Sequence, residues 1–362
     1  MTEPRSFFSA DYTEARAKFL AAAAARGLRH TAYLNPHAKG PKGEDLTIDV
    51  AVLGPTDAKA GLLVISGTHG VEGYAGSGAQ IGWLQSTRNA NWPSGMKLVL
   101  VHALNPYGFA WNRRVNEENV DLNRNFVDHA QPYPMNLGYE LLKSAIAPRD
   151  LKPETLEDAD KALRTYGREH GLFALQEAIS KGQYTHPDGM YFGGTREQWS
   201  VGQILHILRR EFGHAERVAI VDIHTGLGPY GHGEIITEDE ASDVRYARSK
   251  RWWGEVHSTR AGESVSAHVL GSIDSGLIAA LPHAEVTAGG LEFGTSPTLE
   301  VFLGLRADNW LHVLGDPKGP DAPAIKAAIR KAFYPDQDDW KDMVWKRSEQ
   351  VLSQAVEALA AG

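Results

Sequence analysis

The stretch Leu62-Leu-Val-Ile-Ser-Gly-Thr-His-Gly-Val-Glu-Gly73 joins a continuous apolar run to a glycine-rich turn that carries His69 and Glu72. A short apolar run bounded by turn residues is typical of a strand that is buried on both faces of a sheet. We interpret residues 79–85, after the turn, as a helix. The stretch therefore predicts a strand, a turn and a helix, with polar side chains at the carboxyl end of the strand, where open α/β sheets bind ligands.

The same alternation recurs along the chain. Runs rich in β-branched or apolar residues predict further strands at 46–53, 97–102, 218–223, 234–237 and 285–293. Residues 11–26, 199–212 and 274–281 predict helices, and the Pro- and Gly-rich interval Asn35–Glu44 predicts turns. Alternating strands and helices predict an α/β fold: a mixed, twisted sheet with helices on both faces.

The sequence also predicts the domain organisation. No repeat or linker interrupts the sequence, so we expect one catalytic domain over residues 1–362 with a motif core at 46–310. The more polar interval 127–195 predicts a helical insertion. Residues 322–361 predict two C-terminal helices that are broken at Pro335.

Composition excludes several functions. The 362 residues carry a net charge of −8 and no cysteine, which argues against nucleic-acid partners and excludes thiolate metal sites and cysteine nucleophiles. No apolar run reaches the roughly 20 residues that span a bilayer, and Phe19–Ala25 follows acidic residues rather than a basic leader. We therefore expect a cytoplasmic protein without a membrane partner; the sequence does not predict its oligomeric state.

Two histidines and two glutamates lie near predicted strand ends. His69 and Glu72 have the spacing of two metal ligands on one turn, although such a pair also occurs by chance. His224 ends the apolar run 218–223, with Asp222 placed to orient it; a histidine at a strand end also has ordinary structural roles. Glu292 lies in an apolar run, so it needs either a cationic partner or a chemical role such as general base.

The segment 102–126 is dense in asparagine and arginine, with three arginines between residues 113 and 124. Guanidinium groups suit the recognition of a carboxylate or of a developing oxyanion, and a solvated loop is the alternative. Five motifs then occur in order: His69-x-x-Glu72, Asn105-Pro-Tyr-Gly108, Asp121-Leu-Asn-Arg-Asn-Phe126, Asp222-Ile-His224 and Leu291-Glu292. In this order and spacing the chain resembles the zinc carboxypeptidase superfamily, which includes carboxypeptidase A and the succinylglutamate desuccinylase and aspartoacylase deacylases.

The resemblance implies a zinc metallohydrolase with one Zn²⁺ per chain. It implies that His69, Glu72 and His224 hold the zinc, and that Glu292 is the general base for attack by water. Asn123 and Arg124 would bind the free carboxylate of the substrate. Arg114 would stabilise the oxyanion, or its neighbour Arg113 in its place, because the local alignment is loose.

The resemblance leaves the substrate open. Carboxypeptidase A-like enzymes close over the substrate with a tyrosine before the catalytic Glu, but no Tyr occurs between Tyr246 and Tyr334. Asp-Ile-His-Thr-Gly and Leu-Glu-Phe-Gly-Thr resemble the deacylase branch, whereas Asn-Pro-Tyr-Gly-Phe resembles the peptidase branch. We expect a carboxypeptidase acting on a small peptide; the alternatives are an N-acyl-amino-acid deacylase and an inactive ligand-binding homologue. A Gly-x-Ser-x-Gly elbow and a His-Glu-x-x-His motif are absent from the sequence, and residues 67–78 lack the glycine patterns of phosphate-binding loops.

Overall fold

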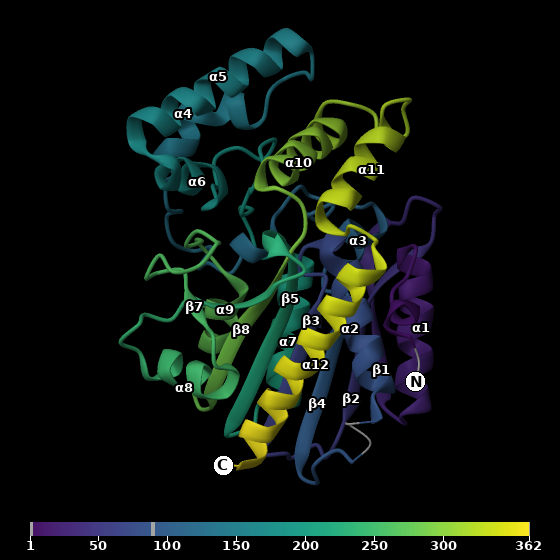
Figure 1. The fold of residues 1–362 in the computed structure, drawn as a ribbon. Helices are drawn as coiled ribbons and strands as arrows, with labels where there is room; N and C mark the ends of the chain where they lie inside the picture. The colour runs from purple at the N-terminus through teal and green to yellow at the C-terminus, as the bar shows by residue number, and fades with distance from the viewer. Residues whose placement is uncertain (1–2, 88–90, 362) are drawn as a thin grey trace.

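The computed structural model describes residues 3–87 and 91–361, so the outermost residues of the expected domain, 1–2 and 362, lie outside it. One eight-stranded sheet runs through the molecule in the order β1-β2-β4-β3-β5-β8-β6-β7 (Figure 1). The strands are β1 (Arg29–Lys39), β2 (Asp45–Leu53), β3 (Ala60–Ser66), β4 (Met96–His102), β5 (Arg217–Tyr230), β6 (Gly233–Thr237), β7 (His257–Ser258) and β8 (Glu285–Gly294). β4, β3, β5 and β8 are parallel at the centre, and antiparallel pairs flank them. The predicted mixed sheet is confirmed.

Helices cover both faces of this sheet. α1 (Tyr12–Ala25), α2 (Gly73–Gln85) and α12 (Asp338–Ala361) pack on one face; α7 (Trp199–Phe212) and α9 (Ile273–Ala280) pack on the other (Figure 1). The alternation of side chains along β3 explains this arrangement, because successive residues of a strand point to opposite faces. Leu62 and Val64 join the first core, whereas Leu63 and Ile65 join the second.

A second group of helices gathers beyond the carboxyl ends of the parallel strands. The interval 127–195 contains α4 (Leu137–Ile146), α5 (Pro153–His170) and α6 (Leu172–Ser180), which lie together at one end of the molecule (Figure 1). α10 (Thr298–Val313) and α11 (Ala322–Phe333) lie near this end too. The two predicted C-terminal helices are α11 and α12, and the gap between them contains Pro335. Elsewhere lie the short helices η1 (Pro4–Phe7), α3 (Pro106–Ala110) and η4 (Leu122–Arg124), and the ten-residue helix α8 (Val244–Trp253).

One prediction was wrong. The interval Asn35–Glu44 was expected to form turns, yet β1 continues to Lys39 and only the residues after it turn. Pro36 is tolerated because β1 is the edge strand, where one missing N–H leaves no central ladder bond unmade. The register with β2 shifts between Leu34 and Lys39, which is where the proline lies.

The fold brings three predicted strand ends together. β3, β5 and β8 are adjacent and parallel, so the residues at or just beyond their carboxyl ends share one edge of the sheet. Those residues include His69 and Glu292. His224 lies within β5, level with the end of β3, because β5 continues to Tyr230 rather than ending at residue 223 as predicted. None of the described helices combines the length and the apolar character needed to cross a membrane.

Candidate metal centre

His69 and Glu72 lie on one short turn after β3. His69 precedes the 3-10 helix η2 (Gly70–Glu72), and Glu72 ends it where α2 begins. Gly70 is required because a Cβ atom at this position would lie 2.0 Å from the backbone of Gly108. The turn leaves the two side chains facing each other, with His69 Nδ1 2.9 Å from Glu72 Oε1.

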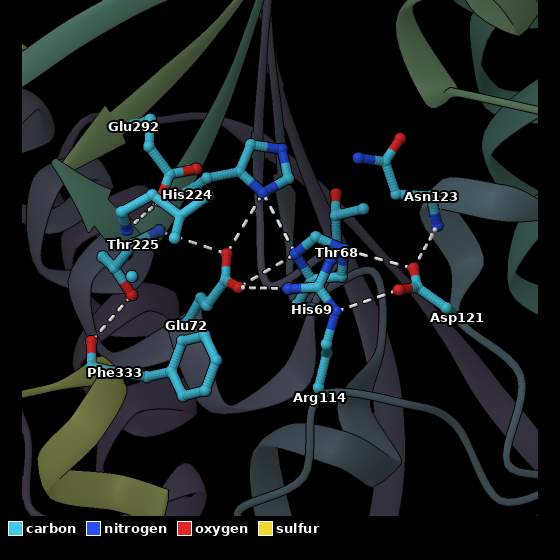
Figure 2. A network of polar contacts seen from close by, with 12 residues as sticks. Thr68, His69, Glu72, Arg114, Asp121, Asn123, His224, Thr225, Glu292 and Phe333 are labelled. Atoms are coloured by element: carbon cyan, nitrogen blue, oxygen red, sulfur yellow. Dashed lines mark hydrogen bonds and ion pairs between the residues drawn. The ribbon is translucent and has the colours of Figure 1, made fainter. Parts of the chain in front are cut away.

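His224 reaches the same point from β5. The pairing of β3 with β5 sets Ser66 beside Ile223, so His224 lies against the turn that follows β3. Its Nδ1 atom is 3.1 Å from Glu72 Oε2 and 3.2 Å from His69 Nδ1 (Figure 2). The three side chains are buried, and their candidate ligand atoms all lie within 4.8 Å of one another. These residues could hold a metal ion.

The histidine rings are turned so that Nδ1 faces this point. His224 Nε2 lies 2.8 Å from Asp222 Oδ2, and the Asp222 carboxylate also accepts hydrogen bonds from Thr68 Oγ1 at 2.8 and 2.9 Å. His69 Nε2 lies 3.2 Å from Asp121 Oδ1. A carboxylate at Nε2 keeps the proton of a neutral imidazole there, which leaves the Nδ1 lone pair free to bind a metal. Asp222 therefore contacts His224 as the sequence predicted for an orienting partner.

The electrostatics of the cluster favour a cation. Burial alone would lower the pKa of His224, but Asp222 and Glu72 raise this pKa well above its ordinary value. Burial alone would raise the pKa of Glu72, but His69 and His224 lower it. Buried carboxylates therefore attract positive charge to the point where the Nδ1 atoms converge. A divalent cation fits this donor set, because two imidazoles and one carboxylate match a catalytic zinc site with an open coordination position.

Glu292 lies beside this cluster. The register of β5 with β8 pairs it with His224, and its Oε1 accepts a hydrogen bond from the Leu227 backbone N–H at 2.9 Å. Burial, and then the charge of Glu72, raise the pKa of Glu292 to about 7. Glu292 lines a cavity of about 120 Å³ together with His69 and His224. It is held near the cluster without forming an ion pair of its own among the described residues.

Arg114 closes one side of the cluster. Its Nε donates to Asp121 Oδ2 at 2.9 Å, and its Nη1 lies 3.3 Å from Glu72 Oε1 (Figure 2). Although burial opposes the shift, Arg114 lowers the pKa of Asp121 well below its ordinary value. Arg114 also lines the cavity, so its guanidinium is fixed between the candidate ligand Glu72 and the space available to a substrate.

Asn123 and Arg124 line the same cavity. Asn123 Oδ1 accepts a hydrogen bond from the Ile273 backbone N–H at 2.9 Å. The Arg124 guanidinium donates from Nε and Nη2 to the Ser180 carbonyl and from Nη1 to the Asn123 carbonyl. These bonds fix the guanidinium without neutralising its charge.

Arg113 lies outside this cavity. Its Nε donates to Asp308 Oδ2 at 2.9 Å, and its Nη2 donates to Asn119 Oδ1 at 2.9 Å. The structure thus brings together His69, Glu72, Arg114, Asn123, Arg124, His224 and Glu292, and places Arg113 in a buried ion pair elsewhere.

Sequence reasoning missed Tyr191 and Asp274, which also line the cavity. The Tyr191 ring packs against two guanidiniums, with its centroid 5.4 Å from Cζ of Arg114 and 5.6 Å from Cζ of Arg124. Its φ of 55° is uncommon for a residue other than glycine. No motif or spacing in the sequence points to either residue, because only the tertiary fold brings them next to the other cavity residues.

Comparison with solved structures identifies chains of similar fold. The structure of bovine thrombin-activatable fibrinolysis inhibitor in complex with tick carboxypeptidase inhibitor matches with a TM-score of 0.50 and 10% identity, covering 97% of each chain. Carboxypeptidase A from Helicoverpa armigera matches with a TM-score of 0.43 and 12% identity, covering 90% of this chain and 74% of that one. Succinylglutamate desuccinylase from Chromobacterium violaceum matches with a TM-score of 0.39 and 15% identity, covering 83% and 74%.

The first of these similarities shows a carboxypeptidase-like fold, as the sequence resemblance implied. No curated protein sequence matches the chain. One family model, described as "Protein of unknown function (DUF2817)", matches residues 8–347. Since this match spans most of the sequence, the chain belongs to the DUF2817 family.

Proposed function

We propose that this protein is a zinc-dependent hydrolase that cleaves an amide bond next to a free carboxylate and releases the C-terminal residue of a small peptide. One observation carries the proposal. The Nδ1 atoms of His69 and His224 converge with Glu72, and this cluster opens on the cavity that Glu292 and Arg124 also line. The fold supports it, since a chain of the same fold binds a carboxypeptidase inhibitor.

Each side chain has a chemical role in this proposal. A zinc ion held by His69, Glu72 and His224 would supply a Lewis acid and would lower the pKa of water. Glu292 accepts a proton from the attacking water and returns it to the leaving nitrogen. Arg114 donates hydrogen bonds to the oxyanion that develops on the substrate carbonyl. Arg124 and Asn123 bind the free carboxylate and so place the scissile bond next to Glu292.

A second candidate function is deacylation of an N-acyl amino acid. Both reactions cut an amide whose amine side carries a free carboxylate, so both use Arg124 in the same way. The cavity of about 120 Å³ is smaller than common ligand pockets. It fits a compact group on the amine side of the scissile bond. The two candidates differ in what lies on the acyl side.

The test is a substrate panel with the zinc-loaded protein. It contains peptides with free and amidated C-termini, and N-acetyl and N-succinyl amino acids; amino acid release is measured by mass spectrometry. We expect cleavage of free-carboxylate peptides and little cleavage of their amides. Release from N-acyl amino acids alone would favour the deacylase, and no release from any member would refute the proposal.

Glu292→Gln identifies the base within this assay. It should keep zinc and lower turnover about 10²- to 10⁴-fold, the usual share of general acid–base catalysis. Glu285→Gln is the matched control, because Glu285 begins the same strand and pairs with Arg248 at 3.1 Å. The control should turn over at the wild-type rate.

A further inference from the structure

An apolar groove lies between three helices at one end of the molecule. α5, α6 and α10 form its walls around a volume of about 800 Å³, and Figure 1 shows α5 and α6 beyond the sheet at this end. Its apolar lining consists of Leu163, Leu172, Leu175, Ile179, Leu299 and Phe302. Among the described residues, the groove and the cavity at the candidate metal centre have none in common. The groove is therefore separate from the proposed site.

Two walls of the groove expose large apolar side chains. Leu172, at the start of α6, is 79% exposed, and Leu299, in the first turn of α10, is 65% exposed. Phe173, next to Leu172, is 57% exposed. Single exposed apolar side chains are ordinary, but several around one groove mark an interaction surface.

α5 borders this groove with charged side chains in a fixed order. Its charged stripe, which lies on one face of the helix because the spacings are three and four residues, consists of Glu154, Glu157, Lys161, Arg164 and Arg168. The two acids lie towards the N-terminal end, and the three bases, which line the groove, run from the middle of the helix towards its C-terminal end. All five are exposed, and none has an ion-pair partner among residues 3–87 and 91–361.

The charged stripe is complementary to a reversed copy of itself. Two α5 helices that run antiparallel about a two-fold axis set the glutamates of each helix opposite Arg164 and Arg168 of the other. The N-terminal half of each helix would then lie over the groove of the other copy and shield Leu172 and Leu299 from water. An anion with an apolar chain would match the groove, but it would leave the glutamates of the stripe unmatched.

We propose that this face is the contact between two copies of the chain, which pair through antiparallel α5 helices laid over each other's grooves. The contact is isologous, so both copies use the same stripe and the same groove. Burial of the apolar walls supplies the favourable free energy, and the charges set the antiparallel orientation. The inference does not depend on the proposed reaction, because the cavity at the metal centre takes no described residue from the groove.

Lys161 is the unfavourable position of this pairing. It lies midway between Glu154 and Arg168, so the two copies of this side chain would meet near the axis. Like charges at close range oppose association. Lys161→Met keeps a long side chain and removes its charge, so this substitution should strengthen the dimer.

The test is the oligomeric state of charge-reversed variants, measured by sedimentation equilibrium over a range of protein concentrations. Glu154→Arg with Glu157→Arg makes the stripe entirely basic, whereas Arg164→Glu with Arg168→Glu makes it acidic at both ends. We expect a wild-type dimer, and a dissociation constant about tenfold or more higher for either variant alone, because like charges then face each other. An equimolar mixture of the two variants should form a dimer of one copy of each, because opposite charges again face each other.

Glu169→Arg is the matched control. Glu169 is exposed on α5, but it follows the stripe by one residue and lies outside the groove, so this reversal should leave the dimer unchanged. Leu172→Gln with Leu299→Gln leaves the helix charges in place and should also weaken the dimer. The result therefore does not depend on the folding of the charge-reversed variants.

Three results would overturn the inference: wild-type protein that stays monomeric, charge-reversed variants that dimerise like wild type, and a mixture in which the two variants do not associate. Dodecanoate tests the competing occupant of the groove. If monomeric wild type binds dodecanoate and Arg164→Glu with Arg168→Glu does not, the groove is a site for amphipathic anions rather than for a second copy.

Discussion

The Nδ1 atoms of His69 and His224 lie 3.2 Å apart, and each is within 3.1 Å of a Glu72 oxygen. His224 Nε2 is hydrogen-bonded to Asp222, which holds the proton of a neutral ring away from Nδ1, and His69 Nε2 lies 3.2 Å from Asp121 Oδ1. Two lone pairs at this distance repel each other unless a cation or a proton lies between them. The close approach of these ligand atoms is therefore what a bound cation would stabilise.

Asp222→Asn should weaken metal binding while leaving the three ligands in place. An amide at this position no longer fixes the proton on His224 Nε2, and loss of such a partner usually costs 10- to 100-fold, about 1–3 kcal/mol, in metal affinity. Competition with a chromogenic chelator measures this change. Thr68→Val is the control, since it removes only a hydrogen bond to Asp222 and should have a smaller effect. An unchanged zinc affinity in Asp222→Asn would contradict the orienting role.

Arg124→Ala should raise KM about tenfold or more for substrates with a free carboxylate, because one charge-assisted hydrogen bond contributes about 1.5–3 kcal/mol. Amidated substrates have no carboxylate charge at this end, so their KM should change little. Steady-state kinetics on both forms measure the difference. Equal losses on the two forms would show that Arg124 has another role.

Arg113→Ala offers the contrasting result. Its guanidinium pairs with buried Asp308, so truncation should lower the free energy of unfolding by about 1–3 kcal/mol. Any effect on KM should be the same for free and amidated substrates, because Arg113 lies outside the cavity. Chemical denaturation of the variant tests the first statement. If KM rose only for substrates with a free carboxylate, Arg113 would be a substrate-binding residue, which would contradict this prediction.

The sequence allowed the central residues to be predicted because their positions depend on local rules. His69 and His224 each follow an apolar run of the sequence and Glu292 lies within another, and adjacent parallel strands bring these positions together. Motif order, by way of a family resemblance, supplied their roles. The pairing of His224 with Glu292 in the register of β5 and β8 agrees with that assignment.

Other features depend on contacts that no local pattern encodes. The partner of Arg113 is Asp308, which is distant in the sequence, so nothing near Arg113 distinguishes it from Arg114. Asp274 looks like an ordinary first-turn helix residue until the fold places it in the cavity wall. Pro36 led us to expect a turn, because a strand tolerates proline only at the edge of a sheet. That β1 is an edge strand is known only from the fold.

Tyr191→Leu should impair the site more than Tyr191→Phe. The ring packs against Arg114 and Arg124, and phenylalanine keeps this contact whereas leucine loses the aromatic face. Cation–π contacts contribute about 0.5–2 kcal/mol, so kcat/KM should fall several-fold or more in the leucine variant. Kinetics of the two variants at equal zinc loading test this. Equal rates in the two variants would leave the aromatic face without a role.

His102 should make the protein less stable in acid. Burial lowers its pKa from an ordinary 6.5 to about 4, so the unfolded chain binds more protons between these pH values. The free energy of unfolding therefore falls as pH drops below 6.5 and levels off below 4. From pH 7 to 5, wild type should lose about 2 kcal/mol more than His102→Gln, which does not titrate. Denaturant titrations at the two pH values give this difference; parallel losses would contradict it.

The most direct test of the metal centre is a zinc titration of the metal-free protein by calorimetry, in wild type, His224→Ala and Glu292→Gln. We predict one zinc per chain in wild type and in Glu292→Gln, because the proposal assigns Glu292 as the base and not as a ligand. His224→Ala should lose most of this affinity, since it removes one of three protein ligands. Wild-type protein that binds no zinc, or a His224→Ala variant that binds it as tightly as wild type, would contradict the account.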